Sequence, residues 1–410
     1  MRPLRLIAAL VILCAPLLSA VTPRVATAES GYTSIAALDD YFDSEVLRVA
    51  VGTTVEWQNL GRNKHTVTAD DGSFDSGNME PGSEFSWTFD QPGVYRYYCV
   101  YHGSRGGVGM AGIVVVGDVP LPGGGGSSVG PGREPVPRGS GRTYRVPQDE
   151  QTIQGAVDVA APGDMVLVSP GIYREAVKVL TPYLTIRGTD RNGVILDGGL
   201  HLANGIHVAE ADGVVVENLT VRHYLLNGLY WNSVNGYRAS YVTAYANGDY
   251  GIYAFNSVWG RFDHDYAAGN PDSGFYIGQC YPCHALITDV TAVDNAVGYS
   301  GTNAGGELYI VNSEWHDNMG GIVPNTLDSE RLAPQRGVFI SGNYVHDNNN
   351  RDAPAKPLQT VALGIGIVVS GGQDNSIGGN LVEDHAVYGI GVFPMLARHP
   401  RLERAPATSG

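Results

Sequence analysis

The segment GIHV at residues 205–208 returns as GLYW at 228–231, GIYA at 251–254 and GFYI at 274–277, each copy starting 23 residues after the one before. The series continues with VGYS from Val297 and GGIV from Gly320. A period of about 20 to 25 residues with short apolar segments and recurrent glycine is typical of a solenoid. A single coil cannot bury its inner face, so the repeat predicts a stack of β-coils.

Alternate side chains of each copy should point to opposite faces of a strand. The residue after the glycine should face the inside of the coil, which gives the set Ile206, Leu229, Ile252 and Phe275. The next residue should face outward, which gives the set His207, Tyr230, Tyr253, Tyr276 and Tyr299. Asparagines that recur at turns can form ladders of side chains along the stack.

A second marker, an Asp or Asn, recurs at Asp289, Asn312, Asn343 and Asn380. Its last two steps exceed the regular period and predict two insertions, a shorter one around NTLDSERL and a longer one around RDAPAKPLQTVAL. Residues 149–160 are expected to form a short amphipathic helix that caps the first coil. Residues 143–395 thus resemble a right-handed parallel β-helix of the pectate-lyase-like and NosD-like kind. The tail, residues 396–410, offers no clear cap for the last coil.

A different pattern precedes the repeats. In residues 29–117 the segments VLRVAVGTTVEWQNLG and SEFSWTFDQPGVYRYYC alternate apolar and polar residues, with the turn-forming segments DDGSFDSG and EPGS between them. Short strands at this spacing predict a β-sandwich. Residues 118–142 are rich in glycine, proline and serine and should form a flexible linker. The expected fold class is therefore all-β, with a sandwich followed by a solenoid.

The N-terminus has the features of an export signal. MRPLR supplies positive charge, LIAALVILCAPLLSAV supplies an apolar core, and residues 26–28 form an A-x-A cleavage site. We therefore expect residues 1–28 to be a signal peptide and the protein to be secreted, periplasmic or associated with the cell envelope. No other run reaches the roughly 18 consecutive apolar residues expected of a transmembrane segment.

The charge of the chain argues against nucleic acid as a partner. The formal net charge is −15, and only three of the 26 basic residues are lysines. A nucleic-acid-binding protein needs a basic patch, which this composition does not favour.

The stretch YYCVYHGSRGGVGMAGIVVV, residues 97–116, brings Cys99, His102 and Met110 close together. A thiolate, two imidazoles and a weak axial thioether suit a copper ion that cycles between two oxidation states. The second imidazole should come from a distant strand, and His65, well before Cys99 in the chain, is the candidate. Zinc is the nearer rival metal, but a thioether is a poor ligand for zinc.

In order along the chain, NKHTVT, DSGNMEPGSEFSWTF, PGVYRYYCVYH and GMAGIVVV resemble the cupredoxins of the plastocyanin and pseudoazurin type. The resemblance implies a Greek-key sandwich over residues 29–117 with one type 1 copper, equatorial ligands His65, Cys99 and His102, and Met110 as axial ligand. Such a domain carries single electrons and is not an enzyme by itself. Seven residues separate His102 from Met110, where plastocyanin has four, and this glycine-rich loop is expected to bulge outward.

The acidic character of the predicted copper domain points to a kind of partner. Residues 29–117 contain 12 Asp and Glu against 5 Lys and Arg. Complementary charge steers protein encounters, so the redox partner is expected to have a basic surface.

The segment Cys280-Tyr281-Pro282-Cys283-His284 matches the C-x-x-C-H pattern of haem attachment. The regular step from Gly274 to Val297 suggests that this coil has no spare length for a haem pocket. A disulfide between Cys280 and Cys283 is therefore the preferred prediction, since an exported protein folds in an oxidising compartment. Haem, free thiols and a secondary metal site with His284 remain alternatives.

The solenoid admits three functional hypotheses. Tyr230, Tyr253, Tyr276 and Tyr299 can stack on sugar rings, and the nearby Asp263, His264 and Asp265 are candidate acid and base groups of a polysaccharide lyase, hydrolase or epimerase. Alternatively, the solenoid binds a carbohydrate or a partner protein, or it serves copper handling and maturation, as its resemblance to NosD-like solenoids implies. The simplest interpretation is that the tyrosines only pack on one another. This interpretation is favoured because no lyase signature is complete, although catalysis stays an alternative.

Overall fold

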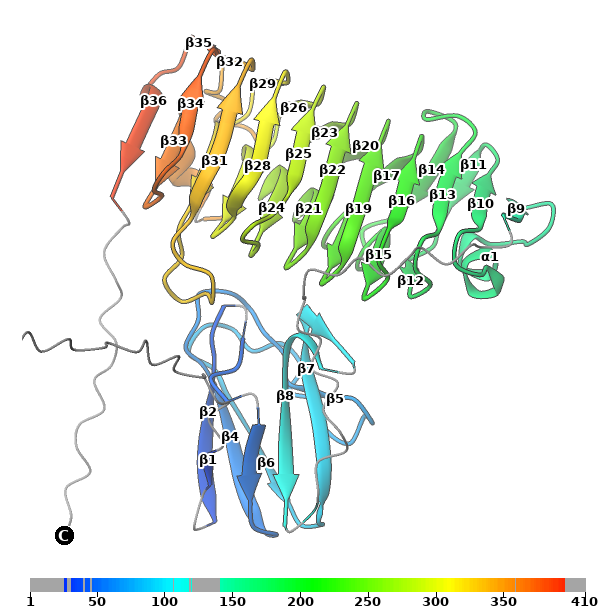
Figure 1. Cartoon of the computed structure of the whole chain (residues 1–410), viewed down its shortest axis with the longest axis vertical. Coiled ribbons are helices and arrows are strands. Elements are labelled where there is room, and N and C mark those ends of the chain that lie inside the picture. Colours follow the sequence, from blue (N-terminus) through cyan, green and yellow to red (C-terminus); the bar gives the residue numbers. More distant parts are fainter. Residues whose placement is uncertain are drawn as a thin grey trace, which may run out of the picture.

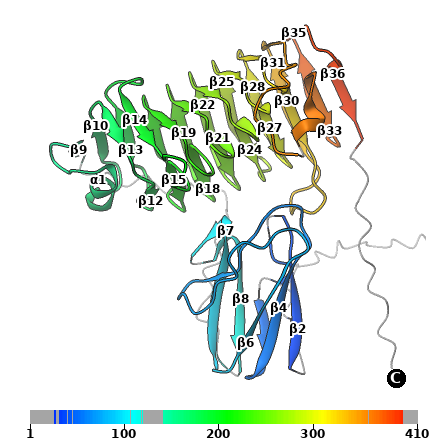
Figure 2. The same ribbon diagram turned by 180° about the vertical axis from the view of Figure 1, so that it is seen from behind.

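The computed structural model describes residues 26–27, 31–39, 41–44, 46–105, 107–117, 119, 141–357 and 359–394. Almost all of the predicted signal peptide, the predicted linker and the tail lie outside the described residues. The described chain is nearly all β and forms a β-sandwich and a right-handed parallel β-solenoid, which lie side by side in Figures 1 and 2. The predicted fold class is confirmed.

The N-terminal part is a sandwich of two sheets, with strand orders β1-β3-β8-β7-β5 and β2-β4-β6. Side chains of β4 are alternately buried and half-buried, as the sequence pattern predicts. Trp57 of this strand packs on Phe89 and Tyr97 in the core. The strands are β1 (Ala26–Thr27), β2 (Tyr32–Ala37), β3 (Val46–Val49), β4 (Thr53–Asn59), β5 (Thr68–Ala69), β6 (Glu84–Phe89), β7 (Gly93–Ser104) and β8 (Val108–Val116).

The C-terminal part winds through three parallel sheets, and a complete coil contributes one strand to each (Figure 1). The first solenoid sheet contains β9 (Thr143–Val146), β10 (Met165–Val168), β13 (Thr185–Gly188), β16 (Val214–Glu217), β19 (Asn235–Ser240), β22 (Val258–Asp263), β25 (Ala285–Thr288), β28 (Gly305–Val311), β31 (Arg336–Ser341) and β34 (Ser376–Gly378). The second contains β11 (Gly171–Tyr173), β14 (Val194–Asp197), β17 (Thr220–Arg222), β20 (Thr243–Tyr245), β23 (Tyr266–Ala268), β26 (Thr291–Val293), β29 (Glu314–His316), β32 (Tyr344–His346) and β35 (Leu381–Glu383). The third contains β12 (Val177–Val179), β15 (Ile206–Ala209), β18 (Leu229–Asn232), β21 (Tyr250–Phe255), β24 (Ser273–Gly278), β27 (Val297–Thr302), β30 (Gly320–Asn325), β33 (Ile365–Ser370) and β36 (Tyr388–Phe393).

The repeated segments form the third sheet, and their glycines have a steric cause. A Cβ on Gly228 would lie 2.7 Å from the carbonyl oxygen of Gly251, and a Cβ on Gly251 would lie 2.6 Å from that of Gly274. Any side chain at these positions would therefore push adjacent coils apart. The predicted inward set is fully buried in the solenoid core, which confirms the inward face of the repeat.

A short helix covers the first coil, as predicted. Helix α1 (Ile153–Val159) begins after Thr152, whose side chain accepts a hydrogen bond from the N–H of Gly155, an N-cap that satisfies one of the free donors of the first turn. Ile153, Ala156 and Val157 of this helix are buried in the solenoid core.

The expected outward orientation of Tyr299 is wrong. Phe275 pairs with Tyr299 and Tyr276 pairs with Ser300, so Tyr299 occupies the inward position and is fully buried. This coil is longer than the regular period: Arg261 pairs with Leu286, and the two extra residues fall in the QCYPCH segment. The chain between β26 and β27 is one residue shorter than in the regular coil, so the net shift at Tyr299 is one residue. A shift of one residue moves a side chain to the opposite face of the sheet.

The first predicted insertion is also one residue shorter than expected. Val311 pairs with Ser341, a step that is one residue less than the step from Asn312 to Asn343. Asn312 is therefore equivalent to Gly342, and both have a positive φ. Asn343 lies one position further along and bonds Asn380 instead.

Asparagine ladders form along the stack, as predicted, and the longest is inside the solenoid. The side-chain oxygen of each member accepts hydrogen bonds from the backbone and side chain of the member one coil before it, over the series Asn247, Asn270, Asn295, Asn318 and Asn348. These amides satisfy buried backbone groups at the turn between the second and third sheets.

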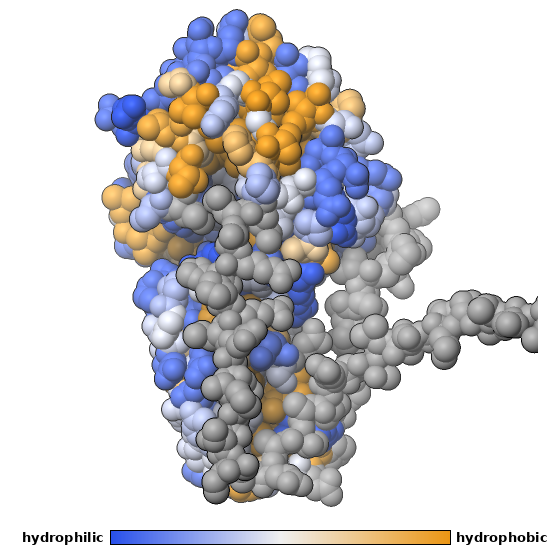
Figure 3. All heavy atoms as spheres, turned by 90° about the vertical axis from the view of Figure 1, so that its left-hand side faces the viewer, coloured by the Kyte–Doolittle hydropathy of each residue, from blue (hydrophilic) through white to orange (hydrophobic). Residues whose placement is uncertain are grey.

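The last coil leaves apolar side chains on the surface. Figure 3 shows them gathered at this end of the solenoid, where Leu381, Ile390 and Val392 are more than half exposed. In the earlier coils, the following coil covers the equivalent positions. The described residues therefore provide no cap here, and the tail to which the expectation applied lies outside the described residues.

Candidate metal centre

The first candidate ligand is held by a loop that folds back on β4. His65 forms an antiparallel bridge with Met79, in which each backbone N–H donates to the carbonyl of the other residue. The side-chain amide of Asn59 donates to the carbonyls of Asn63 and Met79 and fixes both sides of this bridge. His65 is fully buried as a result.

The second and third candidates lie on β7, where the pairing with β8 shifts between Tyr98 and Gly103. Such an irregularity re-aims side chains, and here both Cys99 and His102 reach the same space. The backbone N–H of Thr66 lies 3.4 Å from Cys99 Sγ, and Thr66 Oγ1 accepts from the N–H of Val100 at 2.9 Å. The segment after His65 is thereby attached to the segment after Cys99.

Three donor atoms converge. Cys99 Sγ lies 3.6 Å from Nδ1 of His65 and 3.6 Å from Nδ1 of His102, and the two Nδ1 atoms are 3.2 Å apart. A triangle with these sides has its centre about 2.0 Å from each corner, close to the length of metal–nitrogen bonds and slightly shorter than metal–sulfur bonds. The residues present therefore fit a metal ion bound by one thiolate and two imidazoles.

Burial sets the protonation of the three groups. It lowers the pKa of His65 to about 4, and burial together with the neighbouring His65 lowers the pKa of His102 to about 3. Both imidazoles are therefore neutral near pH 7 and can offer a lone pair to a metal. Burial raises the pKa of the Cys99 thiol, against the opposing effect of the backbone N–H groups of Thr66, Tyr101 and His102. A bound cation would favour the thiolate.

Met110 is buried in the same core as Cys99. It precedes Ala111, which pairs with Tyr98 across the two strands, so Met110 lies near the start of β8 (Val108–Val116) and beside the end of β7 that carries Cys99. The glycine-rich loop between His102 and Met110, which was expected to bulge outward, is partly paired. Gly103 pairs with Gly109 and Ser104 with Val108, so these residues extend the hairpin of β7 and β8.

The predicted tyrosine stripe is covered rather than free. Tyr230, Tyr253 and Tyr276 form a cluster with Phe255. The rings of Tyr230 and Tyr253 stack at 4.7 Å between centroids, and those of Tyr253 and Tyr276 contact each other at 4.8 Å in a tilted arrangement. All three tyrosines face outward from the third sheet, as predicted, but only 2–6% of each is exposed. In this arrangement they offer no open platform to a sugar ring.

The candidate acid and base groups lie away from that stripe. Asp263 ends β22 of the first sheet, where it accepts hydrogen bonds from Arg238 and Arg261. Burial raises the pKa of Asp263, but these arginines together with His264 and Ser240 outweigh burial and the pKa is lowered. Asp263 is thus held as a paired anion.

The neighbours of Asp263 are placed differently from each other. His264 is half exposed at the turn and stacks on Tyr241 at 4.5 Å. Asp265 is buried, its pKa is raised by burial, and it accepts from the N–H of Val242 at 2.7 Å. His264 contacts Asp263 at 3.0 Å, whereas Asp265 is buried, and none of the three contacts the tyrosine cluster in the described contacts.

Cys280 and Cys283 are joined in the turn that follows β24, with Sγ atoms 2.10 Å apart and Cα atoms 4.8 Å apart. The intervening Tyr281–Pro282 peptide is cis. His284 stacks on Trp259 at 4.0 Å and contacts Glu307 at 2.8 Å, so its ring faces the first sheet.

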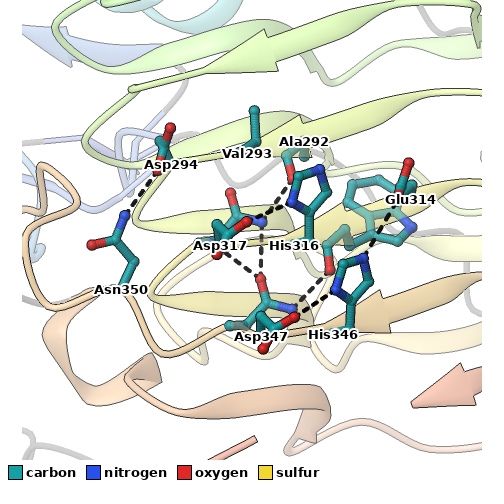
Figure 4. Close-up of polar contacts among 12 residues, drawn as sticks. Ala292, Val293, Asp294, Glu314, His316, Asp317, His346, Asp347 and Asn350 are labelled. Carbon is teal, nitrogen blue, oxygen red and sulfur yellow. Dashed lines mark hydrogen bonds and ion pairs between the residues drawn. The ribbon is translucent and has the colours of Figure 1, made fainter. Parts of the chain in front are cut away.

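A second group of titratable side chains lies on the second sheet, where sequence reasoning placed nothing. Figure 4 shows His316 and His346 one above the other, each bonded to the aspartate that follows it, Asp317 and Asp347. The two rings are 5.0 Å apart and nearly parallel. Among the described residues, His65, Cys99 and His102 form the one His, Cys, Asp or Glu group compact enough to bind a metal ion.

This second group predicts a pH dependence of stability. Burial lowers the pKa of His346, but the carboxylates of Asp347 and Glu314 outweigh burial and the net pKa lies above the ordinary 6.5. The stabilising interaction is therefore complete below pH 6.5 and is lost as pH rises through the folded-state pKa. We expect His346→Gln to lower stability by up to about 1 kcal/mol at pH 5.5 and by less at pH 8.5. Thermal unfolding of both proteins at the two pH values tests this, and equal differences would contradict it.

Comparisons with known proteins concern the sandwich alone. Residues 33–117 match the plastocyanin/azurin family of copper binding proteins. Halocyanin from Natronomonas pharaonis is 40% identical over 80 residues, which are 18% of this chain and 47% of halocyanin. The chain thus spans about half the length of this curated relative.

Solved structures give similar matches. A purple cupredoxin from Nitrosopumilus maritimus is 31% identical and covers 19% of this chain and 82% of its own, with a TM-score of 0.17. A Cu(I) amicyanin variant is 26% identical and covers 21% of this chain and 83% of its own, with a TM-score of 0.19. In the described part of the chain, no helix has the length and apolar character to cross a membrane.

Proposed function

Because residues 33–117 form a cupredoxin domain, which binds copper and transfers electrons, we propose that His65, Cys99, His102 and Met110 hold one type 1 copper ion in it. The observation that carries this proposal is the convergence of one sulfur and two imidazole nitrogens within 3.2–3.6 Å of one another. His65 and Cys99 are fully buried, which keeps water from the ligand set.

Copper bound here would alternate between Cu(I) and Cu(II) and so carry one electron at a time. The chain's own residues supply a fixed frame for that change. Neutral imidazoles and a thiolate suit both oxidation states, and the bridge from His65 to Met79 holds one ligand while the bond from Thr66 holds another. A site held in this way suits electron transfer rather than hydrolysis, because the ligand set leaves no obvious position for substrate.

The experiment that tests this function is a copper titration of the purified chain, followed by absorption spectroscopy and metal analysis. We expect one copper per chain and an intense visible absorption that bleaches when the protein is reduced. Stoichiometric copper without strong visible absorption, or no retained copper, would contradict the proposal.

The axial role of Met110 makes a separate prediction. The axial ligand tunes the reduction potential of such sites more than it holds the metal. We therefore expect Met110→Leu to keep copper and the visible absorption but to raise the reduction potential, since leucine offers no donor to stabilise Cu(II). Cyclic voltammetry of both proteins measures the shift, and an unchanged potential would argue against axial ligation by Met110.

We further propose that the protein works outside the cytoplasm and exchanges electrons with a partner that has a basic surface. The signal-like residues 1–28 and the acidic composition of residues 29–117 support these two points. For the solenoid, binding of a partner is favoured over polysaccharide chemistry, because the tyrosines expected to stack on sugar are covered.

A further inference from the structure

The cupredoxin domain contacts the solenoid with the end that carries its ligands. The ring of His102 lies 5.8 Å from the ring of Phe255 on β21. Tyr230 on β18 donates its hydroxyl hydrogen to the backbone carbonyl of Tyr101, the residue before this ligand, at 3.1 Å. His102 is less buried than His65 and Cys99, and its ring is in contact with the solenoid through Phe255.

The solenoid surface at this contact is unusual for an outer face. We define the aromatic face as Tyr230, Tyr253, Phe255 and Tyr276, which form one cluster on neighbouring coils of the third sheet. Soluble proteins rarely leave such a contiguous aromatic patch exposed unless it binds something. Each of the four is at most 6% exposed, and contacts to the cupredoxin domain come from two of them.

A second contact comes from the first insertion. The loop between β30 and β31 departs from the coil and reaches the cupredoxin domain, as Figure 1 shows. There Ser329 bonds Asp39, Asp328 pairs with Arg62 at 3.2 Å, and the guanidinium of Arg331 lies 5.2 Å from the ring of Tyr41. Insertions into a regular repeat often carry binding surfaces, and this one serves a contact within the chain.

The second insertion supports the same region from the solenoid side. Lys356 from the loop before β33 pairs with Asp249 and with Asp272, the latter at 3.8 Å. Its ammonium lies 5.9 Å from the ring of Tyr250, which stacks on Tyr253 at 4.4 Å. The first insertion thus contacts the cupredoxin domain, and the second borders the aromatic face through Tyr250.

We propose that the aromatic face is a resident docking partner for the copper-ligating end of the cupredoxin domain, so that an external redox protein reaches His102 only after the two domains separate. This inference rests on the proposed copper site. Its physical basis is that an electron leaves a buried metal most readily through the ligand nearest the surface, and here that ligand faces Phe255. Since both partners belong to one chain, their effective concentration is high and a modest contact keeps the closed form dominant.

The test compares full-length, copper-loaded proteins. The variant Tyr230→Ala/Phe255→Ala removes two outward rings of the aromatic face. The matched control, Tyr309→Ala/Phe339→Ala, removes an exposed Tyr and Phe that contact each other on the first sheet. Each protein is mixed with a small basic c-type cytochrome and, separately, with hexaammineruthenium, and the electron-transfer rate constants are measured.

We expect the variant to react with the cytochrome about tenfold faster or more than the unaltered chain, because the open fraction limits access in the closed form. The control should react like the unaltered chain, and the small ruthenium complex should respond far less to the substitutions. Small-angle X-ray scattering should show a larger radius of gyration for the variant alone. Equal cytochrome rates in all three proteins would overturn the proposal, and so would scattering from the unaltered chain that fits separated domains.

The two failures are distinguishable. If the copper site is wrong, the unaltered chain lacks the visible absorption, whereas scattering of the metal-free protein still reports whether the domains are docked. If docking is wrong, the absorption persists in all three proteins while the rates and radii stay the same.

Discussion

Replacing Cys99 with serine is expected to abolish the intense visible absorption of the copper-loaded protein and to weaken copper binding more than about 100-fold. Even the loss of a group that only hydrogen-bonds to a metal ligand typically weakens metal binding by about 10–100-fold. Serine leaves His65 and His102 in place, 3.2 Å apart at their Nδ1 atoms, but removes the one soft anionic donor. Competition titration with a Cu(I) chelator and absorption spectroscopy measure the two effects.

The control for this substitution is the double variant Cys280→Ser/Cys283→Ser. It removes the joined cysteines of the solenoid and leaves Cys99, so it should keep the absorption. If the absorption is lost in this control but persists in Cys99→Ser, the metal is bound in the solenoid and not in the cupredoxin domain. That result would contradict the proposed site.

Replacing Asn318 with alanine is expected to destabilise the solenoid by about 2–4 kcal/mol, because several buried groups lose a hydrogen-bond partner at once. The side-chain oxygen of Asn318 accepts from both the backbone and side chain of Asn295, and its amide donates to the carbonyl of Ala292 and to Asn348. All members of this contact are buried, so water cannot replace the missing bonds. Chemical denaturation followed by far-ultraviolet circular dichroism measures the loss.

The matched control is Asn192→Ala, at an exposed position in the turn before β14. Surface substitutions of this kind usually change stability by less than about 0.5 kcal/mol. If Asn318→Ala costs no more than this control, the ladder does not contribute to stability and the interpretation of the buried asparagines is wrong.

Periodic features were predictable because local geometry dictates them. Glycine recurs where a Cβ would collide with the next coil, and strand alternation alone assigns Ile252 and Phe275 to the core. The convergence of Cys99 with His65 was predictable from residue chemistry together with the resemblance to cupredoxins, although the two residues lie far apart in the sequence.

Other features could not be predicted, since they depend on single-residue register or on distant segments. Two extra residues in QCYPCH and the loss of one before β27 leave a net shift of one residue, which turned Tyr299 inward, and nothing in the repeat marks that shift. The outward Tyr230 has the same sequence pattern whether a sugar, solvent or another domain covers it. Its contact with Tyr101 joins residues 129 positions apart, and the loop at Ser329 reaches back 290 positions to Asp39.

The most direct test of the central claim is X-ray absorption spectroscopy at the copper edge of the loaded, full-length protein. We predict one short copper–sulfur distance and two copper–nitrogen distances, and the sulfur scatterer should disappear from the spectrum of Cys99→Ser. A spectrum that requires only nitrogen and oxygen donors, or one unchanged by that substitution, would contradict a copper centre built from His65, Cys99 and His102.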